Sequence, residues 1–294
     1  MNPQYEKKRY NYGLGYRILH VKGNHAGDST LSYLHYSLSC MLLYFKSGEG
    51  VIKIEGRTYK LHTGDVVLLN PSEIFMFSVD DTIPHERLTV NVDESMFDSF
   101  GGIHKELFSP FYNREKGTGN VIPAEKVQEL GLDIYLDNII EYAESSKQTV
   151  PLMIFCKLTE FLSSLKEISD APQNENQVPL NPLVENVLNY LNIHFKEDIS
   201  ISSVAEKFNI DKSYLSHLFK EHTGVSLWTY VIYRRIQVFN SLILQGGTAE
   251  KNCYKVGFQN YSNFFRLYKK HMGIAPTQFK KETKTSVRAI TPYI

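Results

Sequence analysis

Two stretches of the sequence place hydrogen-bonding and cationic side chains on one face of a predicted helix. In the first, "DKSYLSHLFKEHTG", three apolar residues would turn inward: Leu215, Leu218 and Phe219. Residues spaced i, i+3, i+4 and i+7 share one side of a helix. The outer face therefore holds Ser213, Ser216, His217 and Lys220. Small hydroxyls and an imidazole can approach base edges in a DNA groove, whereas a lysine suits a backbone phosphate.

The second stretch, "QNYSNFFRLYKKHMGIA", repeats the first at an offset of 49 residues, so that Gly273 aligns with Gly224. Its outer face would hold Tyr261, Ser262, Phe265 and Arg266, followed by Lys269 and Lys270. Arg266 is the best single candidate for a bidentate contact with guanine. A solvated face with no DNA contact is the alternative for each residue alone, and it weighs more at Ser213 than at Arg266.

The connection between the two repeats predicts a rigid spacer. Residues 226–245, "SLWTYVIYRRIQVFNSLILQ", contain no Gly or Pro and would form a helix of about 30 Å. Recognition helices that enter successive major grooves on one face of DNA lie about 34 Å apart. Each repeat with its preceding short helix has helix-turn-helix spacing. Arg234 and Arg235 in the spacer contact phosphates or join the two units through acidic partners; the second reading is favoured for at least one of them.

Residues 1–122 have the pattern of a different fold. Short β-branched or aromatic runs alternate with turn residues about every ten positions: Gly48, Gly50, Gly56, Gly64 with Asp65, and Asn70 with Pro71. This pattern predicts antiparallel strands in a β-barrel or sandwich. In "HERLTVNVD", Leu88, Val90 and Val92 would face one way. The chain is thus expected to be an α+β protein of two domains.

From residue 123 the apolar period lengthens to that of helices. Residues 123–168 should be helical, with these residues on apolar faces: Ile139, Ile140, Ile154, Phe155, Leu158, Phe161 and Leu162. A dimer contact and packing against the β-sheet domain are equally good explanations. Residues 169–180 are polar and aperiodic and predict a linker. Residues 181–294 should be all helical, with Pro182 in a first turn, Ser200 and Asp211 as N-caps, and Gly224 as a C-terminal stop.

The net charge of the chain changes sign at the same boundary, between residues 180 and 181. Residues 1–180 hold 17 Lys and Arg against 24 Asp and Glu, whereas residues 181–294 hold 15 against 8. Only the second half has the positive excess that favours a polyanion. Cys40, Cys156 and Cys253 have no paired spacing, which predicts reduced cysteines and no zinc motif. With no long apolar run and no signal-peptide pattern, we expect a cytoplasmic protein without a membrane partner.

Residues 181–281 resemble the DNA-binding domain of the AraC family of transcription regulators. The landmarks are "ISISSVAEKFNIDKSYLSHLFKEHTGVSLWTYVIYRRI" and "VGFQNYSNFFRLYKKHMGIAPTQFKK", with Gly257, Phe258, Gly273 and Pro276. The resemblance implies base-reading positions at Ser213, Ser216 and His217 in the first unit, and at Tyr261, Ser262 and Arg266 in the second. It also implies a homodimer that binds the major groove of double-stranded DNA and activates transcription with RNA polymerase.

The second unit departs from the family pattern. Ala249, Asn252 and Cys253 stand where the family usually has Ile and Ile-Ala, and the loop "QGGT" is one residue shorter. A buried Asn252 without a hydrogen-bond partner would cost about 1–3 kcal/mol. The sequence thus predicts a looser second unit.

The segment "YFKSGEGVIKIEGRTYKLHTGDVVLLNP" resembles the cupin-like sensing domain of the same family. The resemblance implies a small-molecule, sugar-like effector inside the barrel, near Tyr44, Phe75 and Phe77. Cupin enzymes hold their metal through a His-x-His pair, which is missing after His35, so no metal, cofactor or catalytic residue is expected. The histidines of this half are expected at the surface or in a pocket: His20, His25, His35, His62 and His85. The alternatives are a metal-dependent cupin enzyme fused to a DNA-binding module, and a constitutive DNA binder whose barrel only dimerises.

Overall fold

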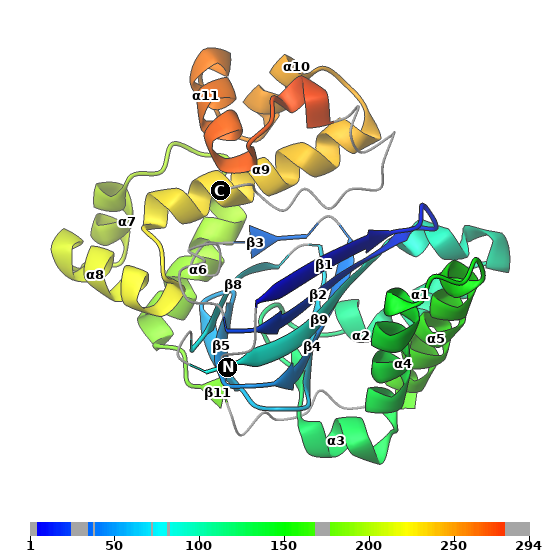
Figure 1. Cartoon of the computed structure of the whole chain (residues 1–294). Coiled ribbons are helices and arrows are strands. Elements are labelled where there is room, and N and C mark those ends of the chain that lie inside the picture. Colours follow the sequence, from blue (N-terminus) through cyan, green and yellow to red (C-terminus); the bar gives the residue numbers. More distant parts are fainter. Residues whose placement is uncertain are drawn as a thin grey trace.

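The computed structural model describes residues 5–24, 35–37, 39–71, 73–80, 83–167 and 177–279. Its N-terminal part is a β-domain with attached helices, and its C-terminal part is a helical domain that begins at Pro182 (Figure 1). The prediction of a two-domain α+β fold is confirmed. In the described residues, no helix is long and apolar enough to cross a membrane.

The β-domain consists of two antiparallel sheets. The first has the order β1-β2-β9-β4-β7-β10 and the second the order β11-β6-β5-β8-β3. The strands of the first sheet are β1 (Glu6–Asn11), β2 (Tyr16–Gly23), β9 (His85–Val92), β4 (Cys40–Ser47), β7 (Asp65–Leu69) and β10 (Val121–Ile122). Those of the second are β11 (Gln177–Val178), β6 (Arg57–Leu61), β5 (Gly50–Ile54), β8 (Ile74–Val79) and β3 (His35–Tyr36). The predicted turn residues lie at the strand ends.

Both faces of the first sheet are covered, and for this reason β4 and β7 read as nearly continuous apolar runs. Alternate side chains such as Leu43 and Phe45 face the second sheet. Leu88, Val90 and Val92 share one face, as predicted, and this face points the other way, toward the helices that follow the sheet. These are η2 (Glu94–Phe100), α1 (His104–Leu107), α2 (Ser109–Tyr112), α3 (Ala124–Glu129), α4 (Leu132–Glu144), α5 (Val150–Ser164) and η3 (Leu165–Glu167).

The apolar faces of α4 and α5 pack against the first sheet. Six of the seven residues expected on these faces are buried and Phe155 is half-buried, all in the core between helices and sheet. Packing within the β-domain therefore accounts for these residues. A different set of α4 and α5 side chains faces solvent, including Ile134 and Leu152.

The helical domain is built on helices that follow one another along the chain. They are α6 (Pro182–His194), α7 (Ile201–Lys207), α8 (Lys212–Thr223), α9 (Leu227–Gln245), α10 (Ala249–Lys255) and α11 (Tyr261–Met272). The predicted caps are present: the side chains of Ser200 and Asp211 accept backbone N–H groups, and Gly224 ends α8 at φ +81°. We call α7–α8 the first unit and α10–α11 the second unit. They lie at opposite ends of α9 (Figure 1).

The segment before α6 differs from a free linker. Of the predicted linker 169–180, residues up to 176 lie outside the described residues, but Gln177 and Val178 form β11. This strand pairs with β6, so that Gln177 lies opposite Tyr59 and Val178 opposite Thr58. The helical domain thus begins four residues after a strand of the β-domain's second sheet.

Candidate nucleic-acid interface

Helix α8 presents the predicted face to solvent. Ser213, Ser216, His217 and Lys220 are all exposed, whereas Leu215 and Phe219 are fully buried. The N-cap Asp211 accepts the backbone N–H of Tyr214 at 2.8 Å and fixes where the helix starts. Burial of the apolar stripe fixes the rotation of the helix, and the four polar side chains point outward as a consequence. Tyr214 is also exposed on this helix, at 52%. Helical periodicity did not predict its exposure.

Helix α11 repeats this arrangement at the other end of α9. Its N-cap Asn260 accepts the backbone N–H of Asn263 at 2.9 Å. Ser262, Arg266 and Lys269 are exposed, and Tyr261 is half-buried. Phe264 and Tyr268 are buried against Phe239 of α9, and their ring centroids lie 4.6 and 5.3 Å, respectively, from that of Phe239. The Arg266 guanidinium donates to the side-chain oxygen of Asn263 at 3.2 Å, which orients it along the helix surface.

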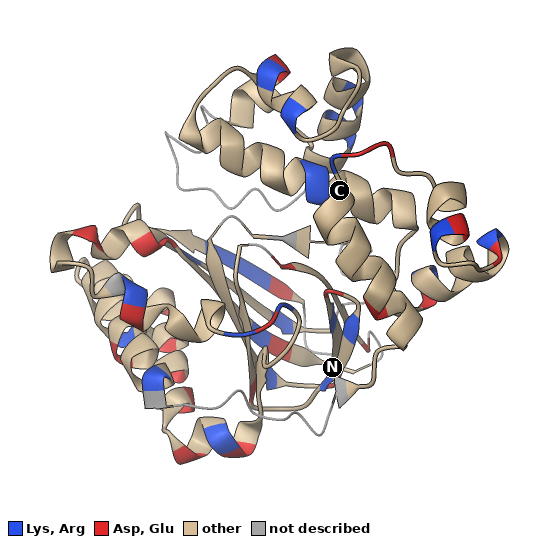
Figure 2. Cartoon of the chain, turned by 180° about the vertical axis from the view of Figure 1, so that it is seen from behind, with Lys and Arg blue, Asp and Glu red and all other residues tan. Residues whose placement is uncertain are grey.

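The spacer α9 has 19 residues, or about 28 Å of helix. Twelve of them are buried, so the helix is the central element of the domain rather than an exposed rod. Figure 2 shows basic residues of the helical domain near both ends of this helix.

Arg234 and Arg235 of α9 are each only 4% exposed, and neither is available to a phosphate. Arg235 donates to the backbone oxygens of Phe195 and Glu197, at 2.7 Å each, and its guanidinium lies over the ring of Phe258 at 5.4 Å. It therefore joins the end of α6 to the second unit, through carbonyl groups instead of the expected acidic partner. Arg234 does have an acidic partner, but this is Glu55 of the β-domain.

The second unit is closely packed despite its departures from the family pattern. Asn252 is 2% exposed and donates to the backbone oxygen of Gly246 at 3.0 Å. It thus fastens the short loop between α9 and α10, and the cost of an unpaired amide does not arise. The thiol of Cys253 is fully buried, and this burial raises its pKa to about 11. The prediction of a looser second unit finds no support in these contacts.

The three residues expected around an effector do not lie together. Phe75 and Phe77 belong to the core between the two sheets. Tyr44 lies on the opposite face of the first sheet, in the core under the helices, where burial raises the pKa of its hydroxyl. Successive residues of a strand point to opposite sides, and Leu43 and Phe45, on either side of Tyr44, take the positions toward Phe77.

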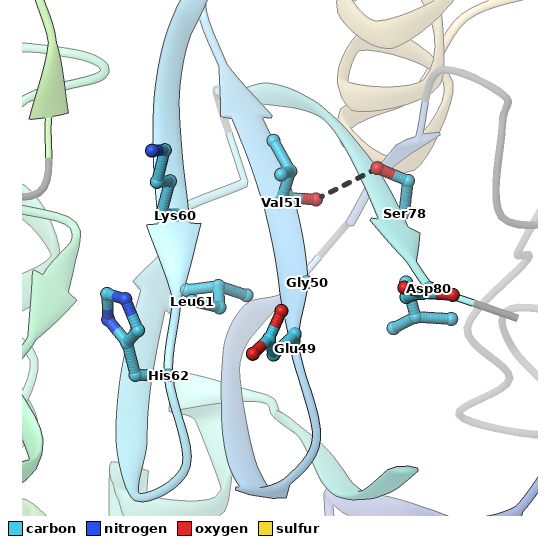
Figure 3. A pocket seen from close by; sticks show the side chains of 9 residues that line it. Glu49, Gly50, Val51, Lys60, Leu61, His62, Ser78 and Asp80 are labelled. Carbon is cyan, nitrogen blue, oxygen red and sulfur yellow. Dashed lines mark hydrogen bonds between the residues drawn. The ribbon is translucent and has the colours of Figure 1, made fainter. Parts of the chain in front are cut away.

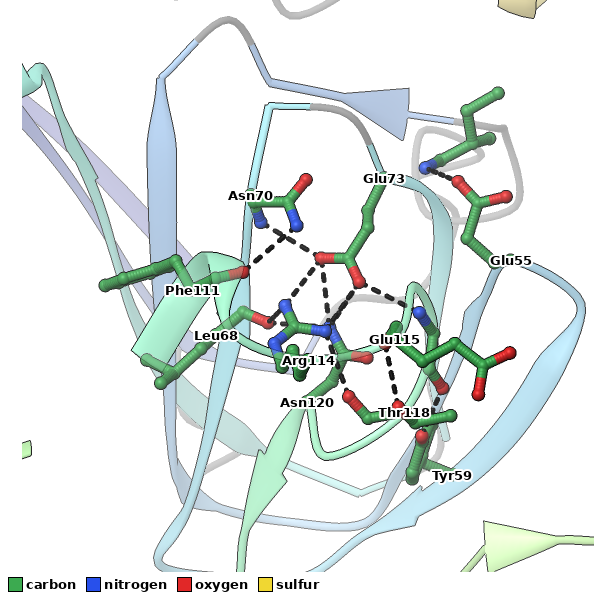
Figure 4. Close-up of polar contacts among 12 residues, drawn as sticks. Glu55, Tyr59, Leu68, Asn70, Glu73, Phe111, Arg114, Glu115, Thr118 and Asn120 are labelled. Atoms are coloured by element: carbon green, nitrogen blue, oxygen red, sulfur yellow. Dashed lines mark hydrogen bonds and ion pairs between the residues drawn. The ribbon is translucent and has the colours of Figure 1, made fainter. Parts of the chain in front are cut away.

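A polar network fills one end of the core between the sheets (Figure 4). Glu73 is fully buried, and Arg114 donates to both its carboxylate oxygens, at 2.6 and 2.7 Å. The carboxylate also accepts from the backbone N–H groups of Asn70 and Gly117 and from the amide of Asn120. These contacts hold the loop 113–120 against the sheet. No sequence pattern indicates this pairing, because Glu73 and Arg114 lie in separate polar loops.

Two open hollows lie on the outside of the β-domain. The hollow in Figure 3 has a volume of about 550 Å³ and lies at one end of β5, β6 and β8. Its polar lining consists of Glu49, Lys60, His62, Ser78 and Asp80. The other, of about 640 Å³, lies between α4 and strands of the first sheet and is lined mainly by charged residues, among them His20, Glu86 and Glu144.

Histidines and acids do not assemble a metal site in the described residues, where no group of three or more His, Cys, Asp or Glu could hold an ion. His20 and His85 are buried, His35 is half-buried and His62 is exposed; His25 lies outside the described residues. Cys40 and Cys253 are buried and Cys156 is exposed, and all three are free thiols.

The two capped helix pairs on a common spacer, joined to a β-domain, define a two-domain helix-turn-helix protein. Comparison with protein families gives the same division: the model of the AraC-like ligand binding domain matches residues 20–162, and that of a helix-turn-helix domain matches residues 204–282. The chain belongs to the AraC-type family of transcription regulators. It is a regulator with a ligand-binding domain and a helix-turn-helix DNA-binding domain.

Curated relatives extend over most of the chain. The uncharacterized HTH-type transcriptional regulator YdiP of Escherichia coli is 23% identical over 83% of this chain and 78% of its own. The arabinose operon regulatory protein of the same organism is 26% identical over 83% and 80%. The lactose operon transcription activator of Staphylococcus xylosus is 20% identical over 79% and 80%.

Proposed function

We propose that this protein activates transcription by binding a specific DNA site through α8 and α11, under the control of a small hydroxylated effector bound by the β-domain. The observation that carries the DNA-binding assignment is the pair of exposed polar faces on two capped helices joined by one buried helix. Ser213, Ser216, His217, Tyr261, Ser262 and Arg266 are the base-reading candidates, and Lys220 and Lys269 the phosphate contacts. Access to chromosomal DNA and RNA polymerase requires a cytoplasmic location.

A selection from random duplex DNA with the full-length protein tests this proposal. We expect enrichment of one sequence with two short conserved blocks about one helical turn apart, because each unit would occupy one major groove. Binding to the enriched site should weaken steeply with added salt, as phosphate contacts release counterions. If no sequence is enriched from the random pool, at low salt as well as at physiological salt, the assignment is contradicted.

The proposed effector class follows from two considerations. Relatives include proteins named for the arabinose and lactose operons. The hollow in Figure 3 also combines carboxylates, an ammonium group, an imidazole and a hydroxyl within one open site, and such groups suit the hydroxyls of a sugar. Fold similarity alone does not assign a ligand, so the effector needs its own test.

Thermal unfolding in the presence of sugars provides that test. A bound sugar at about 100 times its dissociation constant should add about 2.7 kcal/mol to the free energy of unfolding. Lys60→Ala should abolish this gain if the hollow is the site, because Lys60 is exposed there and its loss leaves the core intact. Lys105→Ala, an exposed lysine elsewhere on the β-domain, is the control. If no small molecule shifts the melting temperature, the constitutive DNA binder becomes the better description, in agreement with the filled core around Phe75 and Phe77.

A further inference from the structure

The turn between β5 and β6 extends from the β-domain into the helical domain. It consists of Glu55 and Gly56, with φ +49° and +81°. Two-residue hairpin turns with both residues at positive φ favour Asn, Asp or Gly at the first position. A glutamate there costs about 1 kcal/mol or more in backbone energy. Contacts made by the Glu55 side chain are therefore expected to offset this backbone cost.

The Glu55 carboxylate makes its contacts across the domain boundary. One oxygen accepts the Ile74 backbone N–H at 2.8 Å, and the other accepts the Tyr230 hydroxyl at 2.7 Å. Both oxygens accept from the same guanidinium nitrogen of Arg234, at 2.8 and 2.7 Å. The side chains of Glu55 and Arg234 are each 5% exposed. We call these two residues the interdomain pair.

Further contacts place the β-domain against α9 and the end of α8. Tyr230, Arg234 and Gln237 lie on one side of α9, and Gln237 donates to the backbone oxygen of Pro71 at 2.7 Å. The Lys53 ammonium donates to the backbone oxygen of Glu221, near the end of α8, at 2.6 Å. The β-domain thus holds both the spacer and the first recognition helix.

The loop 113–120 connects this boundary to the interior of the β-domain. A Cβ at Gly117 would lie 3.0 Å from the Cβ of Glu55, and the backbone N–H of Gly117 donates to Glu73 in the buried network. The network of Figure 4 therefore supports the turn that carries the interdomain pair. Gly117 therefore links the buried network to Glu55, and a change in the core between the sheets would be transmitted to Glu55 through this residue.

A buried ion pair is suited to a reversible contact. The free energy lost by removing both charges from water is similar to that gained by their attraction, so the intact pair adds little net stability. Removal of one partner, however, leaves the other charge buried and strongly disfavours the docked arrangement. The pair therefore fixes one alignment of the domains without making it permanent.

Docking places opposite charge excesses side by side. The half of the chain that contains the β-domain has seven more acidic than basic residues, and the half that contains the helical domain has seven more basic than acidic ones. A docked acidic domain repels the phosphate backbone. It also holds α9 and α8 in one orientation, which limits adjustment to the grooves.

We propose that the interdomain pair holds this regulator in a docked, low-affinity state, and that separation of the domains raises its affinity for DNA. This inference rests on the proposed DNA-binding function. An effector would act by binding the docked and the separated states with different affinities. Couplings of this kind typically change affinity about 5- to 150-fold.

Glu55→Asn in the full-length chain tests the proposal. Asparagine suits a positive φ, so the hairpin should remain folded, but its side chain is too short to reach Arg234. We expect a larger radius of gyration in small-angle X-ray scattering and at least about fivefold tighter binding to a generic duplex at low salt. Glu185→Gln is the matched control: Glu185 pairs with Arg57 across the same boundary but is 37% exposed, so its neutralisation should change neither quantity.

A second variant separates the effect of the stranded Arg234 charge from the loss of the pair itself. Adding Arg234→Met to Glu55→Asn removes the stranded charge and should move both measurements back toward the wild-type values. An unchanged radius of gyration in Glu55→Asn would overturn the role of the pair, and a larger radius without tighter binding would overturn the low-affinity assignment. If none of the proteins binds DNA, the proposed function fails, whereas the scattering still decides whether the pair docks the domains.

Discussion

Arg266 and Lys220 are both exposed cations on the recognition helices, but they are expected to act differently. Arg266 lies in the middle of α11 and is held along the helix surface by Asn263, a position from which a guanidinium can reach a base edge. Lys220 lies in the last turn of α8, where a lysine also favours the helix dipole. The arginine should read sequence and the lysine should add general affinity.

Arg266→Ala should cost about 1–3 kcal/mol of binding free energy and relax the preference at one base pair. Lys220→Ala, its control, should weaken binding to all sequences alike and lower the salt dependence by about one phosphate contact. Titration of the selected site and its single-base variants at several salt concentrations measures both effects. The base-reading role of Arg266 fails if its variant keeps the full base preference.

Amphipathic periodicity predicted most of the residues of α8 and α11 that face solvent, because burial of one stripe fixes the opposite one. It did not predict the exposure of Tyr214, and Tyr261 is half-buried. The partner of Arg234 could not be predicted in this way. Glu55 precedes it by 179 residues and lies in a turn whose sequence, Glu-Gly, reads only as a hairpin. The interdomain pair depends on how the two domains pack, and a local sequence pattern does not indicate this packing.

At the scale of elements, the turn between α10 and α11 approaches the end of α6. Gly257 has φ +93°, and a Cβ added there would lie 2.3 Å from the backbone oxygen of Lys196. Arg235 binds the backbone oxygens on either side of Lys196, those of Phe195 and Glu197. The Gly-Phe motif seen in the sequence therefore serves the packing of the second unit onto α6.

Gly257→Ala should lower the free energy of unfolding by about 2–5 kcal/mol, since backbone strain and a backbone clash add. Gly101→Ala is the control, because Gly101 also has a positive φ, +67°, but nothing within 4 Å of the added Cβ. It should cost only about 1–2 kcal/mol. Chemical denaturation followed by circular dichroism compares the two. Equal losses would show that the contact with Lys196 is unimportant.

Caps predicted several helix boundaries, since Ser200, Asp211 and Gly224 act through their nearest backbone groups. The strand β11 was missed. A two-residue strand in a polar segment has no period of its own, and it exists because β6 offers an edge for pairing. Asn252 was located correctly in the core, but its partner at Gly246 depends on the fold of the preceding loop.

At the scale of the whole molecule, we expect a homodimer formed through α5. Leu152 is 62% exposed on this helix, and Phe155, one turn further, packs against Phe100, which is itself 57% exposed. These side chains form an apolar surface on the outside of the β-domain. A second copy of the chain would cover it and would double the number of DNA contacts.

Leu152→Glu should weaken dimerisation by about tenfold or more, equivalent to about 1.4 kcal/mol. Ile134→Glu is the control, since Ile134 is also 62% exposed but lies on α4. Sedimentation velocity over a range of protein concentrations measures the monomer fraction. If Leu152→Glu leaves the dimer unchanged, or if the wild-type protein is a monomer, the interface on α5 is wrong.

The buried spacer α9 sets a rule for the genomic sites that this protein can occupy. A continuous helix packed on most sides cannot lengthen, shorten or twist to follow a displaced target. Two sequence blocks that match α8 and α11 but are separated by an extra half turn of duplex would face opposite sides of the DNA. Promoters controlled by this protein should therefore tolerate substitutions within the gap between the blocks far better than insertions or deletions of bases there.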